Sequence, residues 1–316
     1  MEMMLVINTF QIPCKIIYGK SCTKNVGQEA KKYGNKAMIV TGRKSSKKSG
    51  ALDAVIESLK KSSIDYIVFD NVKSDPDVET VDKGSNLAVG ESIEVIIALG
   101  GGSPLDAAKA MSVMATNGGS ISEYEFKNPE KEGIPVIAIP TTAGTGSEVS
   151  KFVVITDEKR KIKMLIGGNT MLPKVAMLDE ELTLTCPPSV TAATGMDALT
   201  HAIESYISKV SQPITDMYAL SAIKLISQNL NKAVLNGSNM EARRLMILGQ
   251  MFAGMAFSNA SVALVHAMSR PLGAYFGVPH GLANAMLLPE VMKYNRPVSY
   301  TTLRAHETVL DTVCRH

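Results

Sequence analysis

The sequence predicts an α/β region with a doubly wound parallel sheet, followed by an all-helical region. In the first half, short apolar runs alternate with helical patterns, which is typical of parallel strands that are covered on both faces. From about Glu180 onward, Met, Ala, Leu and Ile recur at the spacing of amphipathic helices. The chain has 316 residues, of which 45% are hydrophobic, so it is long and apolar enough for about two domains.

The first half is expected to contain strands that are separated by helices. Strands are predicted at 37–40, 66–69, 95–99 and 136–139. Helices are predicted at 50–61, 78–89 and 104–115. Because a helix lies between each strand and the next, the strands should pair in parallel through βαβ units.

The second half is expected to contain helices alone. They are predicted at 190–208, 213–229, 240–259, 261–272 and 282–294. The pattern changes between Leu178 and Thr185. We therefore expect one domain over residues 1–180 and a second, all-helical domain over residues 181–316.

Two glycine-rich loops follow apolar strands. The first, LGGGSPLD over 99–106, opens a helix for which we expect Ser103 at the N-cap, Pro104 at the first helical position and Asp106 at the third. Backbone N–H groups at such a helix start favour a phosphate, although a tight turn needs the same glycines. The second, PTTAGTGSE over 140–148, adds small hydroxyl groups. Two such loops at the carboxyl ends of parallel strands favour a dinucleotide over a structural turn.

The loop after the first strand indicates which nicotinamide dinucleotide is bound. It reads VTGRKSSK over 40–47 and lacks an acidic residue for the ribose 2′-hydroxyl. Gly42 and Ser45, with the basic residues between them, favour NADP(H). A basic loop tip that is merely solvated would have the same composition.

The chain has only five histidines, and three of them fall within residues 195–281. Asp197 and His201 are four residues apart on a predicted helix and so project from one face. His266 lies on a later helix, and His280 lies at a predicted helix start. A carboxylate with three imidazoles suits Fe(II), Zn or Mn. A lone helical histidine is more often a core or surface residue, but the group favours a metal site.

Composition argues against other classes of partner. The net charge is +3 without an extended basic face, so we expect no nucleic-acid partner. No apolar stretch is long enough for a membrane span, and the N-terminus lacks the features of a signal peptide. The four cysteines have no CxxC spacing, so a reduced, cytoplasmic protein is expected. We also expect a homo-oligomer.

Four long motifs give the chain a family resemblance: GGGSPLDAAKA, PTTAGTGSEVSKFVVITD, CPPSVTAATGMDALTHAIESY and HAMSRPLGAYFGVPHGLANAMLLP. With these motifs the sequence resembles the iron-containing (group III) alcohol dehydrogenases, which include 1,3-propanediol and butanol dehydrogenases. The resemblance implies a dehydroquinate synthase-like architecture with a Rossmann-like dinucleotide-binding domain and a metal-binding domain.

The resemblance also implies the roles of individual residues. Asp197, His201, His266 and His280 match the catalytic metal ligands. Gly101, Gly102 and Ser103 match the diphosphate-binding turn. The whole expected cofactor site is Gly42, Ser45, Gly101, Gly102, Ser103, Asp106, Thr141, Thr142, Thr145, Ser147 and Lys163.

The implied activity is that of a metal-dependent, NAD(P)-dependent alcohol dehydrogenase or aldehyde reductase of the EC 1.1.1 class. It would transfer a hydride between NAD(P), with NADP favoured, and a small primary alcohol or diol through a metal-bound alkoxide. The resemblance favours Fe(II), although the ligands also suit Zn. The alternatives are a zinc-dependent polyol dehydrogenase or lyase of the same fold, and a truncated, inactive fragment that binds the dinucleotide.

Two departures from the family accompany the resemblance. Arg270 stands four residues after His266, where the family often has a histidine or tyrosine near the nicotinamide. The tail after Asn295 does not match the family, which usually continues through further helices. We therefore expect a truncated C-terminus, an incomplete helical domain and weak or absent activity unless another chain covers the gap.

Overall fold

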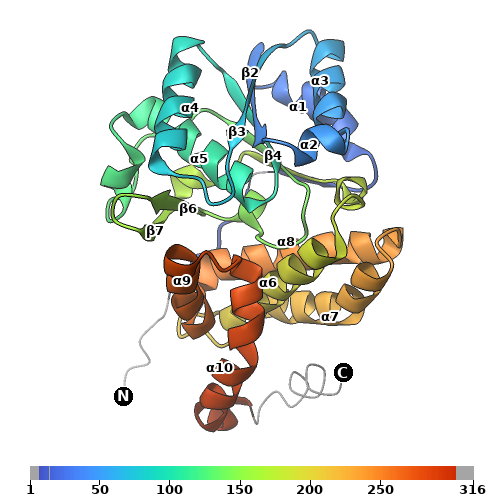
Figure 1. Cartoon of the computed structure of the whole chain (residues 1–316), viewed down its shortest axis with the longest axis vertical. Helices are drawn as coiled ribbons and strands as arrows, with labels where there is room; N and C mark the ends of the chain where they lie inside the picture. Colours follow the sequence, from blue (N-terminus) through green and yellow to red (C-terminus); the bar gives the residue numbers. More distant parts are fainter. Residues whose placement is uncertain (1–6, 14, 304–316) are drawn as a thin grey trace.

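A computed structural model describes residues 7–13 and 15–303 and places an α/β half next to a helical half (Figure 1). The α/β half contains a six-stranded sheet in the order β1-β8-β5-β4-β2-β3, and every pairing in it is parallel. The strands are β1 Lys15–Tyr18, β2 Lys36–Gly42, β3 Asp65–Val72, β4 Val95–Gly100, β5 Val136–Pro140 and β8 Val175–Leu178. The predicted parallel sheet is confirmed, and β1 and β8 are additions to the four strands predicted above.

Helices cover both faces of this sheet, so the doubly wound class is confirmed. They are α1 Val26–Ala30, α2 Ser45–Lys48, α3 Ala51–Lys61, α4 Val78–Gly90 and α5 Gly102–Asn117. Successive side chains of a strand point to opposite faces. Met38 of β2 accordingly packs in the apolar cluster with Leu105 of α5, whereas Ile39 packs in the cluster with Val55 of α3.

The start of α5 differs from the prediction. The helix begins at Gly102 with Gly101 at the N-cap, so placing Ser103 at the N-cap and Pro104 at the first helical position was wrong by two residues. Gly101 has no side chain to cap the helix, and Ser103 instead accepts a hydrogen bond from the amide of Asp75 at 3.2 Å. The first helical N–H groups therefore remain free of a capping side chain.

An antiparallel hairpin, not predicted from the sequence, follows the second glycine-rich loop. It consists of β6 Phe152–Asp157 and β7 Ile162–Gly167. Val153 and Ile155 alternate with more exposed residues and are buried in the cluster that includes α5. Short 3-10 helices occur at η1 Cys22–Asn25, η2 Ile121–Tyr124, η3 Ser147–Val149, η4 Asn169–Met171 and η5 Glu180–Thr183.

The second half is helical throughout its described part. Its helices are α6 Pro188–Tyr206, α7 Pro213–Leu235, α8 Met240–Ala260, α9 Leu264–Phe276 and α10 His280–Leu303. Ala198, Ile226 and Met246 bring α6, α7 and α8 into one apolar cluster. Helix α10 approaches α6 closely, because a Cβ at Gly281 would lie 2.2 Å from the carbonyl oxygen of Ala193. Figure 1 shows α6 and α8 next to the α/β half.

Helix α9 begins later than predicted. Residues 261–263 do not belong to it, because Ser261 has a φ of +64° and the chain is non-helical up to Ala263. The amides of Ala263 and Val265 donate to the carboxylate of Glu204 instead.

Among the described helices, none alone has the length and apolar composition needed to cross a membrane. The bent pair α8 and α9, whose axes differ by 101°, meets this criterion when taken together.

Candidate active site

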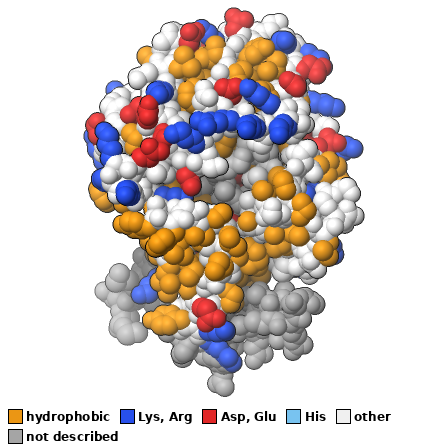
Figure 2. All heavy atoms as spheres, viewed as in Figure 1, with side chains coloured by type: hydrophobic (Ala, Val, Ile, Leu, Met, Phe, Trp, Pro, Cys, Tyr) orange, Lys and Arg blue, Asp and Glu red, His pale blue; other side chains and the backbone are white. Residues whose placement is uncertain are grey.

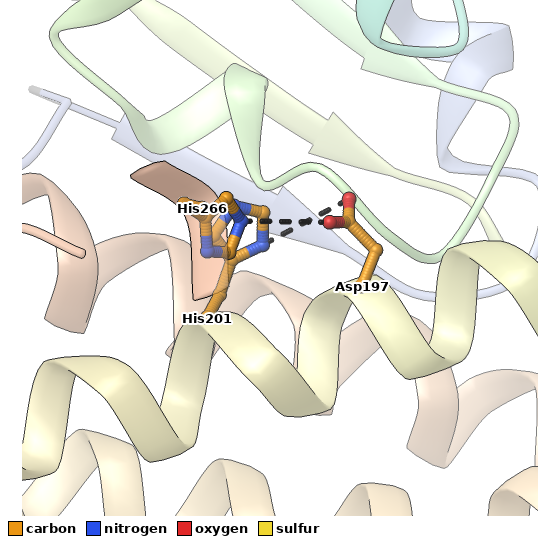
Figure 3. A group of neighbouring side chains, drawn as sticks. All are labelled: Asp197, His201 and His266. Carbon is orange, nitrogen blue, oxygen red and sulfur yellow. Dashed lines mark ion pairs between the residues drawn. The ribbon is translucent and has the colours of Figure 1, made fainter. Parts of the chain in front are cut away.

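A buried carboxylate and two buried imidazoles converge at the surface of α6 that faces α9. Asp197 and His201 are one turn apart on α6, with 3.9 Å between Asp197 Oδ2 and His201 Nδ1. His266 enters from α9, and its Nε2 lies 3.6 Å from Asp197 Oδ1. Figure 3 shows these three side chains pointing toward one another. One potential ligand atom from each lies within 4.8 Å of those of the others.

His280 joins this cluster from the start of α10. Its Nε2 lies 3.5 Å from Asp197 Oδ1, and its side chain is 36% exposed, whereas that of Asp197 is 4% exposed. The cluster therefore opens toward solvent on the His280 side. The structure brings together all four residues that the sequence singled out.

Sequence reasoning missed Glu204, which holds His266 in place. Its Oε2 lies 2.6 Å from His266 Nδ1, and its carboxylate accepts hydrogen bonds from the amides of Ala263 and Val265 at 2.9 and 2.5 Å. Glu204 is 1% exposed. It lies seven residues after Asp197, on the same helix face, and this spacing is the signal that could have found it. A carboxylate on Nδ1 fixes the tautomer and leaves Nε2 directed at the cluster.

Sequence reasoning also missed Asn284, one turn after His280 on α10. Its Nδ2 donates to Asp197 Oδ1 at 2.7 Å and lies 3.2 Å from both His266 Nε2 and His280 Nε2. The Asn284 amide nitrogen therefore lies between three potential ligand atoms, one each from Asp197, His266 and His280. Its Oδ1 is buried and has no hydrogen-bond partner among the described residues.

The surroundings set the protonation of the four side chains. Burial disfavours the charged form of Asp197, but His201, His280 and His266 outweigh this effect and hold its pKa well below the ordinary range. Burial, aided by neighbouring imidazoles, lowers the pKa of His201 to about 3. Burial also lowers the pKa of His280, whereas Asp197 and Glu204 outweigh burial and raise that of His266. Asp197 is thus ionised and His201 and His280 are neutral, which are the forms that bind metals, whereas the two carboxylates beside His266 favour its protonated form.

The donor set fits a divalent cation. His201 Nδ1 is buried without a hydrogen-bond partner among the described residues, and it faces Asp197. An orphaned buried nitrogen is costly unless something binds it. Imidazole and carboxylate are the ligands that Zn and Fe(II) accept.

The two glycine-rich loops lie side by side at the carboxyl ends of β4 and β5. The amide of Thr141 donates to the carbonyl of Gly100 at 2.9 Å. A Cβ at Gly102 would lie 2.6 Å from Thr145 Cγ2, and one at Gly101 would lie 3.4 Å from Thr142 Oγ1. Glycine is therefore required at Gly102 by close packing between the loops. The predicted pairing of the two loops at one sheet edge is observed.

Two residues of the predicted cofactor site lie beneath these loops. Asp106 accepts hydrogen bonds from Ser147 Oγ at 2.5 Å and from the amide of Val154 at 2.9 Å. Lys109 lies 3.6 Å from Asp106, is 1% exposed and donates to three backbone carbonyls, those of Ser147, Ser150 and Phe152. This network fixes the loop and the hairpin that follows it.

The remaining predicted residues lie around the same edge of the sheet. Gly42 ends β2, and Ser45 is exposed at the start of α2. Lys163 of β7 pairs with Asp75 at 2.7 Å, and the amide of Asp75 is the donor to Ser103. Lys163 is thereby tied to the first glycine-rich loop.

The second loop connects this edge to the helical half. A Cβ at Gly144 would lie 2.6 Å from Thr194 Cβ on α6, and Gly146, with a φ of +60°, packs directly against Gly254 of α8. Figure 2 shows Lys and Arg side chains in a band across the α/β half and hydrophobic side chains over the helices below it. The second loop therefore packs against α6 within three residues of Asp197, at the junction of the halves.

A parallel sheet with two glycine-rich loops at one edge therefore stands beside a helical half with a candidate metal site. The family description "Iron-containing alcohol dehydrogenase" matches residues 13–180, and "Fe-containing alcohol dehydrogenase family, C-terminal" matches residues 191–315. The second match extends beyond Asn295, so the prediction that the tail does not match the family was wrong. The chain belongs to the iron-containing alcohol dehydrogenase family. Its predicted fold class, its family and its dehydrogenase activity class are confirmed, and the family implies iron and a nicotinamide dinucleotide.

Individual relatives support this assignment. Alcohol dehydrogenase 4 of Schizosaccharomyces pombe is 41% identical over 290 residues, which cover 92% of this chain and 69% of that protein. The NADPH-dependent butanol dehydrogenase of Clostridium saccharobutylicum is 43% identical over 294 residues, with 92% and 74% covered. A crystal structure of 1,3-propanediol oxidoreductase superimposes with a TM-score of 0.89 at 40% identity and covers 92% of this chain and 76% of that one.

Proposed function

We propose that this alcohol dehydrogenase transfers a hydride between NAD(P) and a small primary alcohol or diol, or the corresponding aldehyde. The observation that carries the proposal is the buried Asp197 cluster on α6, a helix that the second glycine-rich loop contacts, in a member of this family. We propose Asp197, His201, His266 and His280 as the metal ligands, and Fe(II) as the metal, with Zn as the alternative.

The cation would supply Lewis acidity to an alcohol or carbonyl oxygen. The protein's own residues prepare this site. Glu204 orients His266, and the low pKa of Asp197 keeps a negative charge in the buried cluster. Most of the expected rate enhancement is positioning, because the hydride chemistry belongs to the cofactor.

For the cofactor we propose a dinucleotide along the Gly101–Ser103 turn and the hydroxyls of Thr141, Thr142 and Thr145, with Lys163 near the nicotinamide ribose. The free N–H groups at the start of α5 support a diphosphate there. Asp106 and Ser147 would act through the loop that they hold, since they bind each other.

We propose NADP(H) as the preferred form. Arg43 and Lys44 are exposed beside Gly42 and Ser45, whereas Lys47 is engaged by Asp70. The butanol dehydrogenase relative is NADPH-dependent by its name. The test is the ratio of kcat/KM for NADPH and NADH, which we expect to fall when Arg43 and Lys44 are both replaced by Gln.

The decisive experiment follows NADPH absorbance with butyraldehyde after anaerobic loading with Fe(II), and separately with Zn(II). Elemental analysis of the same samples measures the bound metal. Turnover with Fe(II) supports the proposal. No turnover of any small alcohol or aldehyde with either metal would reject it and favour a protein that binds the dinucleotide without using it.

We further propose a division of labour between a dinucleotide-binding domain, residues 1–180, and a metal-binding domain, residues 181–316. In support, the last sheet strand ends at Leu178 and the described chain after η5 is helical.

We propose a cytoplasmic homo-oligomer, since Cys22 and Cys186 are free thiols and Tyr275, Phe276 and Met286 leave an apolar surface exposed. Light scattering after gel filtration tests the oligomer.

A further inference from the structure

Arg270 is a half-buried cation that forms no ion pair with any residue that the structure describes. It has no ion pair or hydrogen bond with another residue in the described part of the chain. Burial lowers its pKa, and Glu204 partly opposes that effect. A guanidinium that is partly removed from water and unpaired is costly, so such groups usually serve an anion.

The position of Arg270 on α9 directs it to the candidate active site. Residues 266, 270 and 273 share one helix face, since they are spaced by four and three positions. His266 on this face belongs to the Asp197 cluster, and a Cβ at Gly273 would lie 3.0 Å from Lys163 Nζ. Arg270 therefore lies between the cluster and Lys163.

The residue before Arg270 lies close to His280, on the open side of the cluster. His280 Nδ1 lies 3.5 Å from Oγ of Ser269, the residue that precedes Arg270. Lys163 is already paired with Asp75. Arg270 is thus the cation with unused donors next to the most exposed of the four proposed ligands.

We propose that Arg270 is a specificity-determining residue that binds an anionic group of the substrate. The substrate class is then a short aldehyde or alcohol that carries a carboxylate or sulfonate at its far end. The axial rise from His266 to Arg270 is about 6 Å, which is on the order of the length of a four-carbon chain. The guanidinium fork matches a carboxylate in two parallel hydrogen bonds. This inference rests on the proposed function.

The test compares two aldehydes of equal length, succinic semialdehyde and the neutral methyl 4-oxobutanoate, with the metal-loaded full chain. Arg270→Gln should lower kcat/KM for the anionic aldehyde by about 10- to 100-fold, the range for a lost charge-assisted hydrogen bond. The kcat/KM for the neutral ester should be the same in Arg270→Gln as in the parent chain. Arg270→Lys should recover part of the loss, and Arg244→Gln, which removes an exposed arginine of α8 paired with Glu241, should change neither value.

Two outcomes would overturn the inference. Equal losses of kcat/KM with both aldehydes would mean that Arg270 does not bind the anionic group of the substrate. A weaker Kd for NADPH in Arg270→Gln, without selective loss of the anionic aldehyde, would assign the guanidinium to the cofactor's phosphates.

Calorimetric titration separates this inference from the proposed function. If the parent chain turns over neither aldehyde, binding of 4-hydroxybutyrate in preference to its methyl ester, abolished by Arg270→Gln, still supports the anion site. Equal binding, or no binding, of the two compounds rejects the site.

Discussion

The two halves of the molecule use polar groups in opposite ways. In the α/β half, the candidate cofactor site consists largely of backbone and small hydroxyls at strand ends, and Gly101, Gly102 and Ser103 are all partly exposed. In the helical half, the polar groups lie inside the packed helices, where Asp197 and Glu204 are 3% and 1% exposed. A loop built on backbone amides depends on shape, whereas a buried cluster depends on the identity of each side chain. Substitutions in the two halves should therefore have different signatures.

The largest effect is expected for Asp197→Asn. The change keeps the shape but removes the charge on which three imidazoles converge, so the metal should be lost. We expect kcat/KM to fall by more than the ~100-fold typical of residues that only support ligands. Metal content and kcat/KM are measured together, with the exposed Asp53→Asn as the control. Full metal content in Asp197→Asn would show that the carboxylate is not a ligand.

Glu204→Gln is expected to have the next largest effect. It should lower both the affinity for the metal and the stability of the fold. The Gln side chain can still accept a hydrogen bond from the amide of Val265 at the start of α9. It lacks the negative charge that Glu204 places next to His266 Nδ1. Metal affinity should fall by about 10- to 100-fold. The free energy of unfolding of the metal-free protein should fall by about 1–3 kcal/mol, because buried hydrogen-bond donors are left poorly paired.

Chelator competition measures the affinity of this variant, and urea unfolding measures its stability. Glu241→Gln on the surface of α8 is the matched control and should be neutral within about 0.5 kcal/mol. Unchanged metal affinity with reduced stability would show that Glu204 only caps the start of α9 and does not support the metal site.

The sequence was more informative about the fold than about the supporting residues of the site. The parallel strands were predictable because they are short and uniformly apolar, as in β4, where every residue is buried. The hairpin β6–β7 was missed because no glycine-rich turn separates its strands. Its connection, residues 158–161, is made of charged residues.

The four proposed ligands were predictable because histidines are rare in this chain. Glu204 and Asn284 were not, because Glu and Asn are common on helices. Their importance arises from packing between helices far apart in the sequence: Glu204 of α6 meets His266 of α9, and Asn284 of α10 meets Asp197. The shifted start of α5 has the same origin, since tertiary contacts of Ser103 replaced the expected local cap.

Gly102→Ala tests the shape dependence of the α/β half and should have a smaller effect. The added Cβ would lie 2.6 Å from Thr145 Cγ2 and should push the two loops apart. The Kd for NADPH should rise by about tenfold, as expected when a hydrogen bond to a phosphate is misaligned. Metal affinity should not change.

The control for Gly102→Ala is Gly90→Ala at the end of α4, where a Cβ would have no neighbour within 4 Å. Fluorescence titration of NADPH compares the two variants. An unchanged Kd in Gly102→Ala would mean that the loops do not bind the cofactor in this arrangement.

The smallest effect on activity is expected for Asp77→Asn, which tests charge in the α/β half away from the site. Asp77 caps α4 by accepting from the amide of Thr80 at 2.7 Å, and Lys73 lies 2.9 Å away. Burial opposes its ionisation, but these hydrogen bonds outweigh burial and lower its pKa from 3.8 to about 2. Asn is also a good N-cap, so the substitution removes the charge and keeps the cap.

A carboxylate whose pKa is lowered by folding stabilises the protein above its ordinary pKa and loses that contribution as the pH falls through the lowered value. The shift corresponds to about 2 kcal/mol at neutral pH, and this contribution should disappear between about pH 4 and pH 2. Asp77→Asn should therefore be less stable than the parent in urea near neutral pH and equal to it near pH 2, with metal content and NADPH affinity unchanged. A stability difference that persisted at the lower pH would show that Asp77 acts through packing and not through its charge.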